Sequence, residues 1–311
     1  MLAYVGVTDF AWYELLARRR GLDEVNFWQP GGNRVFGALE PGGLFLFKLH
    51  APHNAIVGGG FFAHATLLPV GLAWDAFREA NGVESLAEMR ERIGKYRRVE
   101  VEDRKNFTIG CILLEQPFFL NQSQWIPAPS DWARNIVQGK RYDLSIGEGA
   151  LLFERLKFAL GLAGGSEGWP DQWRESTAPR YGAPTTVLPR LGQGSFRVLV
   201  TDAYGRRCAA TGERVLPVLE AAHIRPFSEG GEHRVDNGVL LRSDLHTLFD
   251  RGYLTVSDQA RIEVSHRIRE DFENGRNYYA LHGSVLRLPE DPNLHPNDRF
   301  LRWHAENVYL G

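Results

Sequence analysis

The chain has 311 residues, of which 43% are hydrophobic and 24% charged, and its formal net charge is −2. This length allows two domains with separate cores, and the composition is that of an ordinary globular protein. No run of about eighteen apolar residues and no signal-peptide pattern occurs, and the two cysteines, Cys111 and Cys208, lie far apart. We therefore expect a cytoplasmic protein without a membrane span or a disulfide framework. The small net charge does not exclude a nucleic-acid partner, because phosphate contacts depend on where cations cluster.

Short strands and helices alternate over residues 1–160, which we predict to be the first domain. Thr8 or Asp9 is a predicted N-cap for a helix that buries Trp12 and Leu16. The other predicted elements are strands at 4–7, 44–49, 55–68 and 109–114 and helices at 74–80, 85–93 and 151–160. This order predicts a small curved β-barrel with helices outside it.

Segment 42–69 reads GGLFLFKLHAPHNAIVGGGFFAHATLLP and resembles the PUA-like superfamily, which includes the EVE, YTH, ASCH and SRA domains. The resemblance covers residues 1–155. It implies a barrel that binds a nucleobase flipped out of the duplex, held between aromatic rings and recognised along its edge by hydrogen bonds. The candidate pocket residues are Asn26, Phe27, Trp28, Gln29, His64, Trp125 and Trp132, with Asn106 as a further edge reader. The alternative for each aromatic ring is a place in the core.

Glycine and proline recur from residue 161 to residue 194, which predicts a linker between two domains. Ser195 is the predicted N-cap of a helix that begins the second domain, residues 195–311. After Gly252 the pattern predicts a hairpin around Asp258 and a last helix near 296–309, which together cover the second domain.

Stretch 218–250 reads VLEAAHIRPFSEGGEHRVDNGVLLRSDLHTLFD. An apolar strand ends at His223, a polar glycine-bearing loop leads to Asn237, and a second apolar strand follows. A short helix comes next, with Ser243 as the predicted N-cap and His246 on its first turns. This layout predicts that the two imidazoles lie close to one another.

The order of histidine, asparagine and histidine resembles the HNH nuclease family in the variant with Ala221-Ala222-His223-Ile224, Asn237-Gly238 and Leu245-His246. The resemblance implies a ββα unit that holds one divalent metal, Mg²⁺ or Mn²⁺, over the scissile phosphate of double-stranded DNA. It implies that His223 is the general base, that Asn237 braces the loop and that His246 binds the metal. The candidate phosphate contacts are Arg225, Arg242 and Arg251.

Two departures from the family pattern stand out. Many HNH nucleases carry a second metal ligand before the base histidine, where this chain has Ala222. The metal must then rest on His246 with water and phosphate, or recruit Asp250 or Glu220. The paired CxxC knuckles of zinc-bearing relatives are also missing from the sequence, because Cys208 stands alone, so no structural zinc is expected.

The predicted fold class is α+β, with an N-terminal PUA-like β-barrel and flanking helices followed by a C-terminal ββα-metal domain. The leading hypothesis is a prokaryotic, restriction-type DNA endonuclease that recognises modified cytosine. A homodimer is one way for a single-site nuclease to cut both strands. The alternatives are an HNH enzyme that cuts unmodified DNA or an RNA-containing structure, and a nucleic-acid-binding module that has lost its metal.

Overall fold

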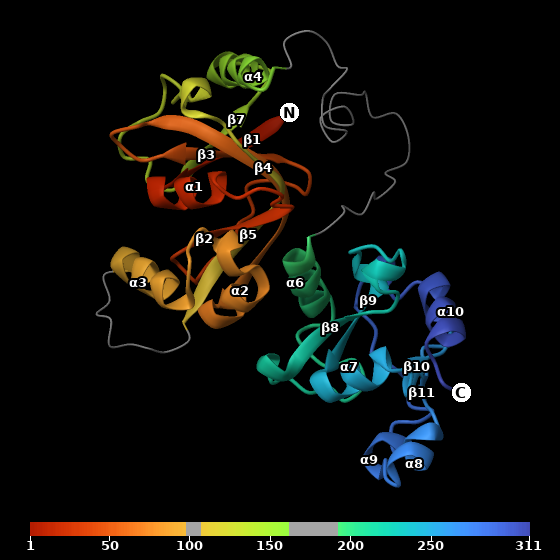
Figure 1. The fold of residues 1–311 in the computed structure, drawn as a ribbon. Coiled ribbons are helices and arrows are strands. Elements are labelled where there is room, and N and C mark those ends of the chain that lie inside the picture. Colours follow the sequence, from red (N-terminus) through yellow and green to blue (C-terminus); the bar gives the residue numbers. More distant parts are fainter. Residues whose placement is uncertain (98–106, 162–191) are drawn as a thin grey trace. The chain divides into compact units, whose positions relative to one another are not determined.

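The computed structural model describes residues 1–97, 107–161 and 192–311. The chain divides into two compact units, Met1–Pro189 and Arg190–Gly311 (Figure 1). Most of the predicted linker lies outside the described residues, as does Asn106. None of the described helices has the length and apolar character that a membrane span requires.

The first unit is built on a mixed sheet of seven described strands in the order β2-β5-β4-β3-β1-β7, with β6 paired to β4. Strands β1 and β3 are parallel, and the other pairs are antiparallel. The strands are β1 (Leu2–Thr8), β2 (Glu24–Gln29), β3 (Leu44–Leu49), β4 (Ala55–Pro69), β5 (Thr108–Phe119), β6 (Ile126–Pro127) and β7 (Gly139–Asp143). In the described part of the chain this path is open, with β2 and β7 at its two ends.

Helices accompany this sheet, and α1 and α4 contribute to its two cores. They are α1 (Phe10–Ala17), α2 (Val70–Phe77), η1 (Arg78–Asn81), α3 (Leu86–Arg97), η2 (Gln122–Gln124) and α4 (Gly147–Ala159). Alternation along β3 sends Leu44 and Leu46 to the core shared with α4, and Phe45 and Phe47 to the core shared with α1. The sheet is therefore buried on both faces, as its continuous apolar strands predict.

Strand β4 bends where small residues permit it. Its register against β5 shifts between Gly59 and Phe61 and again between Phe62 and His64. Gly58 has a φ of 159°, and a Cβ there would lie 2.2 Å from the carbonyl oxygen of Phe118. The glycine run therefore lets two backbones approach closely within a curved strand.

The helix predicted after Asp9 and the strands predicted at 44–49 and 55–68 are confirmed. Asp9 is the N-cap of α1 and its carboxylate accepts a hydrogen bond from the Trp12 amide at 2.7 Å. The helix predicted at 74–80 is wrong in its bounds, because α2 begins at Val70, directly after Pro69. Val70 and Gly71 have weak intrinsic helix propensity, so this start is set by packing against the sheet rather than by local preference.

The second unit contains a ββα arrangement. Strands β8 (Leu219–His223) and β9 (Gly238–Arg242) are antiparallel with His223 opposite Gly238, and α7 (Ser243–Asp250) follows β9 without a loop. The remaining elements are α6 (Gln193–Ala203), η3 (Leu216–Val218), η4 (Phe227–Glu229), η5 (Val235–Asn237), β10 (Leu254–Val256), β11 (Ile262–Val264), α8 (Arg267–Phe272), α9 (Arg276–Tyr279), η6 (Pro292–Leu294) and α10 (Asp298–Asn307).

Two predicted caps are corrected in this unit. Helix α6 begins two residues before Ser195, which is buried inside it, and Gly192 occupies the N-cap position. Ser243 is the first residue of α7, and the extended backbone of Arg242 at the end of β9 serves as the cap. The helix starts one residue early because strand and helix join directly.

Helix α7 is held from behind by a buried histidine of α10. His304 stacks on Phe249 with ring centroids 3.8 Å apart, and its Nε2 lies 3.1 Å from the Phe249 carbonyl oxygen. The Nδ1 atom lies 2.8 Å from the Thr255 hydroxyl. Both ring nitrogens are therefore satisfied within the core, and the C-terminal helix fixes the position of α7, as predicted for a cover over this domain.

Glu115 generates a prediction about pH and stability. Burial and the nearby charge of Glu24 raise the pKa of this carboxyl to about 8. A raised folded-state pKa stabilises the fold fully below the ordinary value of 4.5, and this contribution is lost as the pH rises to 8, by up to about 1.4 kcal/mol per pH unit. Glu115→Gln should therefore gain stability relative to the wild type between pH 5 and pH 8, as measured by urea denaturation. The control is the exposed Glu40→Gln. An identical pH dependence for all three proteins would contradict the burial of a neutral carboxyl.

Candidate active site and base pocket

His223 lies at the C-terminal end of β8. Its imidazole stacks on the Phe196 ring of α6, with centroids 3.8 Å apart and planes 15° apart. Burial, together with the neighbouring His233 and His246, lowers the pKa of His223 to about 4. The ring is therefore neutral at physiological pH, which is the state that a proton acceptor requires.

Asn237 is fully buried and its side chain makes three hydrogen bonds to the backbone. Its Oδ1 accepts from the Arg225 amide at 2.9 Å, and its Nδ2 donates to the carbonyl oxygens of Arg225 and Glu232, both at 2.9 Å. The side chain thus ties residue 237, before β9, to both ends of the loop that leaves β8. This is the bracing geometry that the sequence predicts.

His246 projects from α7 and is flanked by two carboxylates. Its Nδ1 lies 2.6 Å from Oε2 of Glu220 on β8, and its Nε2 lies 3.3 Å from Oδ2 of Asp250, one helical turn on. The side chain is 22% exposed. An Nδ1–H that donates to Glu220 leaves the lone pair of the neutral ring on Nε2, facing the Asp250 carboxylate.

His233 is a third imidazole of this site, and sequence reasoning missed it. Its Nδ1 lies 2.9 Å from Nε2 of His223, and its ring stacks on Phe227 with planes 5° apart. The polar loop gave no periodicity from which this contact could be predicted. Its only signal was a histidine inside the segment between the two strands.

The three predicted phosphate contacts have different surroundings. Arg242 forms a bidentate ion pair with Asp244, at 2.6 and 2.8 Å, so its guanidinium is already engaged. Arg225 donates to the Glu229 carbonyl oxygen and lies over the Trp303 ring, 5.2 Å from its centroid. Arg251 is exposed at the C-terminal end of α7. Arg251 therefore offers the most accessible charge of the three.

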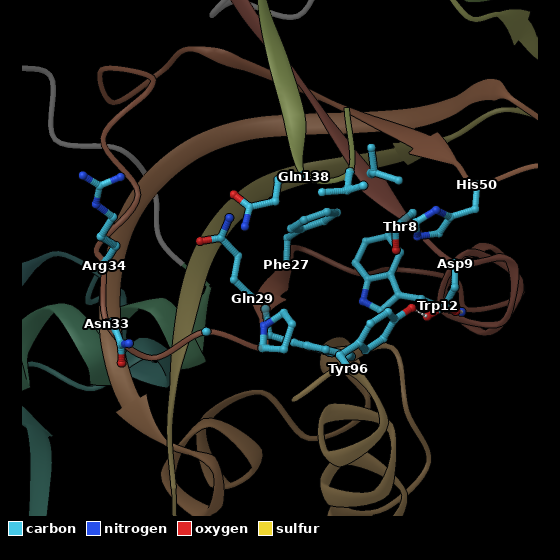
Figure 2. Close-up of a pocket in the computed structure, with 15 residues that line it drawn as sticks. Thr8, Asp9, Trp12, Phe27, Gln29, Asn33, Arg34, His50, Tyr96 and Gln138 are labelled. Atoms are coloured by element: carbon cyan, nitrogen blue, oxygen red, sulfur yellow. Dashed lines mark hydrogen bonds between the residues drawn. The ribbon is translucent and has the colours of Figure 1, made fainter. Parts of the chain in front are cut away.

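The first unit contains a cavity of about 480 Å³ beside the predicted aromatic segment (Figure 2). Phe27, Trp28 and Gln29 at the end of β2 line it, as predicted. Sequence reasoning missed the other lining residues, which come from the segment directly after β2 and from distant parts of the chain: Val7, Thr8, Asp9, Trp12, Pro30, Gly31, Asn33, Arg34, His50, Tyr96, Val137 and Gln138. The cavity therefore combines aromatic walls with a polar edge.

The other four predicted pocket residues do not line this cavity, and the prediction of one pocket is corrected for them. Asn26 is buried and donates to the Asn81 side chain at 2.8 Å. His64 lies in β4 at a register shift. Trp125 donates to the Leu120 carbonyl oxygen and packs edge-on against Tyr13, and the Trp132 ring lies under the Lys48 ammonium group. Strand alternation turns Asn26 away from the face that Phe27 presents.

Comparison with known families decides what the second unit is. Residues 208–257 match the HNH_2 family, which is described as HNH endonuclease. These residues are an HNH endonuclease domain. The match includes His223, Asn237, His246 and Asp250, and it makes the protein a nuclease, a hydrolase of phosphodiester bonds.

Two solved structures are similar to this chain at a low level. One is an ASCH protein from Zymomonas mobilis, with a TM-score of 0.33 and 10% identity over 49% of this chain and 94% of that one. The other is a structure titled "Modification dependent TagI restriction endonuclease", with a TM-score of 0.30 and 13% identity over 97% of this chain and 81% of that one. The comparison with curated proteins found no match.

HNH endonucleases generally use a divalent metal ion, and the donors around His246 fit one. An imidazole Nε2 and the carboxylate of Asp250 face each other, while Glu220 orients the ring from its other nitrogen. Among the described residues no three His, Cys, Asp or Glu side chains form a complete metal cage. A metal here would therefore bind through two protein donors, with water and substrate phosphate as the other ligands.

Asp250→Asn tests this donor pair without any measurement of cutting. The substitution keeps an oxygen but removes the negative charge, so the affinity for Mn²⁺ should fall at least about tenfold. Electron paramagnetic resonance of free Mn²⁺ during a titration of the full chain measures this change. The matched control is Asp258→Asn, in the exposed turn between β10 and β11. An unchanged affinity in Asp250→Asn would remove Asp250 from the metal site.

Proposed function

We propose that this protein is a modification-dependent DNA endonuclease of the restriction type. Its HNH domain hydrolyses the DNA backbone with one divalent metal, Mg²⁺ or Mn²⁺, and its N-terminal unit binds a modified cytosine that has been flipped out of the duplex. The observation that carries the nuclease half is the difference between two histidines. Within the described residues His223 has no carboxylate partner, and its pKa is lowered, whereas His246 is bonded to Glu220 and faces Asp250.

In this proposal His223 is the general base. Its Nδ1 takes a proton from a water molecule while the water oxygen attacks phosphorus, and the bond between phosphorus and the leaving oxygen breaks. The leaving oxygen receives a proton from solvent. Because the pKa of His223 is about 4, the ring is unprotonated at neutral pH and carries one basic lone pair. A metal bound at His246 and Asp250 would supply stabilisation of the charge that develops on phosphate oxygens.

Asn237 contributes position rather than charge. Its bonds to the backbone of Arg225 and Glu232 hold the chain on both sides of the loop, and Arg225 is two residues from His223. Arg251 and Arg225 would then contact phosphates beside the cut, with Arg251 the more exposed of the two. Arg242 would contact a phosphate only after its ion pair with Asp244 opens; otherwise its role would be to hold Asp244 in place.

The cavity of the first unit has the features of a base pocket. Phe27, Trp28 and Tyr96 offer aromatic faces, and Figure 2 shows the amides of Gln29 and Gln138 on its polar side. An amide provides both a donor and an acceptor, which a cytosine edge requires, and stacking on an aromatic ring contributes about 1–3 kcal/mol per base. A single active site cuts one strand, so cleavage of a duplex needs two copies of the chain or two successive nicks.

Cleavage of defined DNA tests the whole proposal. The full chain with Mn²⁺ should cut phage DNA that contains modified cytosine and leave plain DNA intact, and EDTA should stop the reaction. Cleavage of both DNAs would contradict base sensing and support an HNH enzyme of unmodified DNA. Binding without cleavage would support a nucleic-acid-binding module instead.

His223→Ala should abolish cutting and leave DNA affinity nearly unchanged, because the variant loses the proton acceptor but no phosphate contact. Loss of a catalytic base typically slows a reaction about 10²–10⁴-fold. Single-turnover cleavage and a gel-shift titration measure the two properties separately. Retained cutting would remove His223 from the role of base.

Gln29→Ala tests the pocket without disturbing the core, because Gln29 is only partly buried. The variant should lose most of the preference for modified over plain DNA, as should Gln138→Ala. Competition binding with modified and plain duplexes measures this preference. The matched control is Gln122→Ala, an exposed residue outside the cavity. If both pocket variants kept the wild-type preference, this cavity would not be the base site.

A further inference from the structure

The contact between His223 and His233 joins two imidazoles through a single proton. His223 Nε2 and His233 Nδ1 are 2.9 Å apart, and the two planes meet at 63°. Each of these nitrogens is either a donor or an acceptor, depending on the tautomer. Between two neutral rings, one of the two atoms must donate and the other must accept.

The two arrangements have opposite chemical consequences for His223. If His233 Nδ1–H donates, the lone pair of His223 on Nε2 is used, and the proton of the neutral ring is on Nδ1. His223 then has no free lone pair. If His223 Nε2–H donates to His233, the lone pair of His223 is on Nδ1 and remains free to accept a proton.

We propose that His233 is a positioning residue, and that its Nδ1 accepts the Nε2–H of His223 and so fixes the tautomer in which Nδ1 of His223 is the basic atom. This inference rests on the proposed role of His223 as the general base. It assigns a function to a loop histidine outside the histidine, asparagine and histidine pattern of the sequence.

The surroundings hold both rings in place for this contact. Phe196 covers one face of His223, and Phe227 stacks on His233 with centroids 4.8 Å apart. The loop that carries His233 is tied down at the preceding residue, because Asn237 Nδ2 donates to the Glu232 carbonyl oxygen. Asn237 therefore braces the backbone beside both histidines.

A neutral acceptor differs from the carboxylate that orients many catalytic histidines. When His223 takes a proton on Nδ1, its Nε2–H stays bonded to the His233 lone pair, so the imidazolium ion keeps a partner. The described neighbours of His223 include no anion that would raise its pKa, so the ring stays unprotonated before the reaction. The pair therefore fixes the orientation of the base while leaving it unprotonated.

The tautomer is measured directly by nitrogen NMR on the full chain labelled with ¹⁵N-histidine. Two-bond proton–nitrogen spectra at pH 7 should show His223 with an unprotonated Nδ1 and a protonated Nε2. The His223→Ala and His233→Leu spectra assign the signals. A protonated Nδ1 on His223 would overturn the proposal, and this readout does not depend on cutting or on the choice of DNA.

Kinetics of His233 variants provide the second test. His233→Leu removes the acceptor and should slow single-turnover cleavage about 10–100-fold, the usual cost of losing a partner that orients a functional imidazole, with unchanged DNA affinity. His233→Asn places a neutral acceptor in the same region and should recover at least half of that loss on a logarithmic scale. The control is the exposed His266→Leu on the surface before α8, which should cut like the wild type.

Replacing His233 by an anionic acceptor distinguishes a hydrogen-bonding role of this residue from a role in packing alone. His233→Asp should move the acid limb of the pH–rate profile upward by about 1–3 pH units, because a carboxylate raises the pKa of the neighbouring imidazole. Wild-type rates in His233→Leu, an Asn variant as slow as the Leu variant, or an unmoved acid limb in the Asp variant would each overturn the proposal. If His223→Ala still cuts, the proposed function fails at its base. If His223→Ala is inactive and His233→Leu is fully active, only the role of His233 fails.

Discussion

The three hydrogen bonds of the buried Asn237 side chain are the constraint on which the nuclease site depends. They join residue 237, directly before β9, to the backbone of Arg225, just past β8, and of Glu232, just before His233. Without them the segment between the two strands would be a surface loop with several conformations. With them, the backbone after β8 has a single conformation, and His223 is held against Phe196 and His233. A single amide thereby sets the geometry of a base that it does not touch.

Different electrostatic surroundings then suit His223 and His246 to different roles. The carboxylates of Glu220 and Asp250 both approach His246, whereas the close partners of His223 in the described part of the chain are the Phe196 ring and the His233 imidazole. Anionic neighbours favour binding of a cation, and an apolar, uncharged surrounding favours a neutral proton acceptor. In the proposed metal site, Asp250 would supply from the helix the anionic oxygen that the strand lacks at Ala222.

Much of the site was predictable because its signals are local. The apolar strands on either side of Asn237 and the helical spacing around His246 fix their own elements, and β3 has the bounds that its alternation predicts. The residues that sequence reasoning missed reach the site and the cavity through tertiary contacts. His233 reaches His223 only because the loop folds back, and Tyr96 and Gln138 reach the cavity of Phe27 from other elements. Asn26 and Arg242 look like ligand-binding residues in the sequence, but Asn81 already accepts from the side-chain nitrogen of Asn26, and Asp244 already pairs with the guanidinium of Arg242.

The central claim is that His223 and His246 serve one phosphate from two elements of the HNH domain. Crystals of the His223→Ala chain with a bound duplex and Mn²⁺ test it most directly, because the anomalous signal of manganese locates the metal without assumptions. The account predicts a manganese peak at His246 Nε2 and Asp250, with a backbone phosphate bound to it on the side that faces residue 223. A peak elsewhere, or a phosphate that faces away from residue 223, would contradict the account.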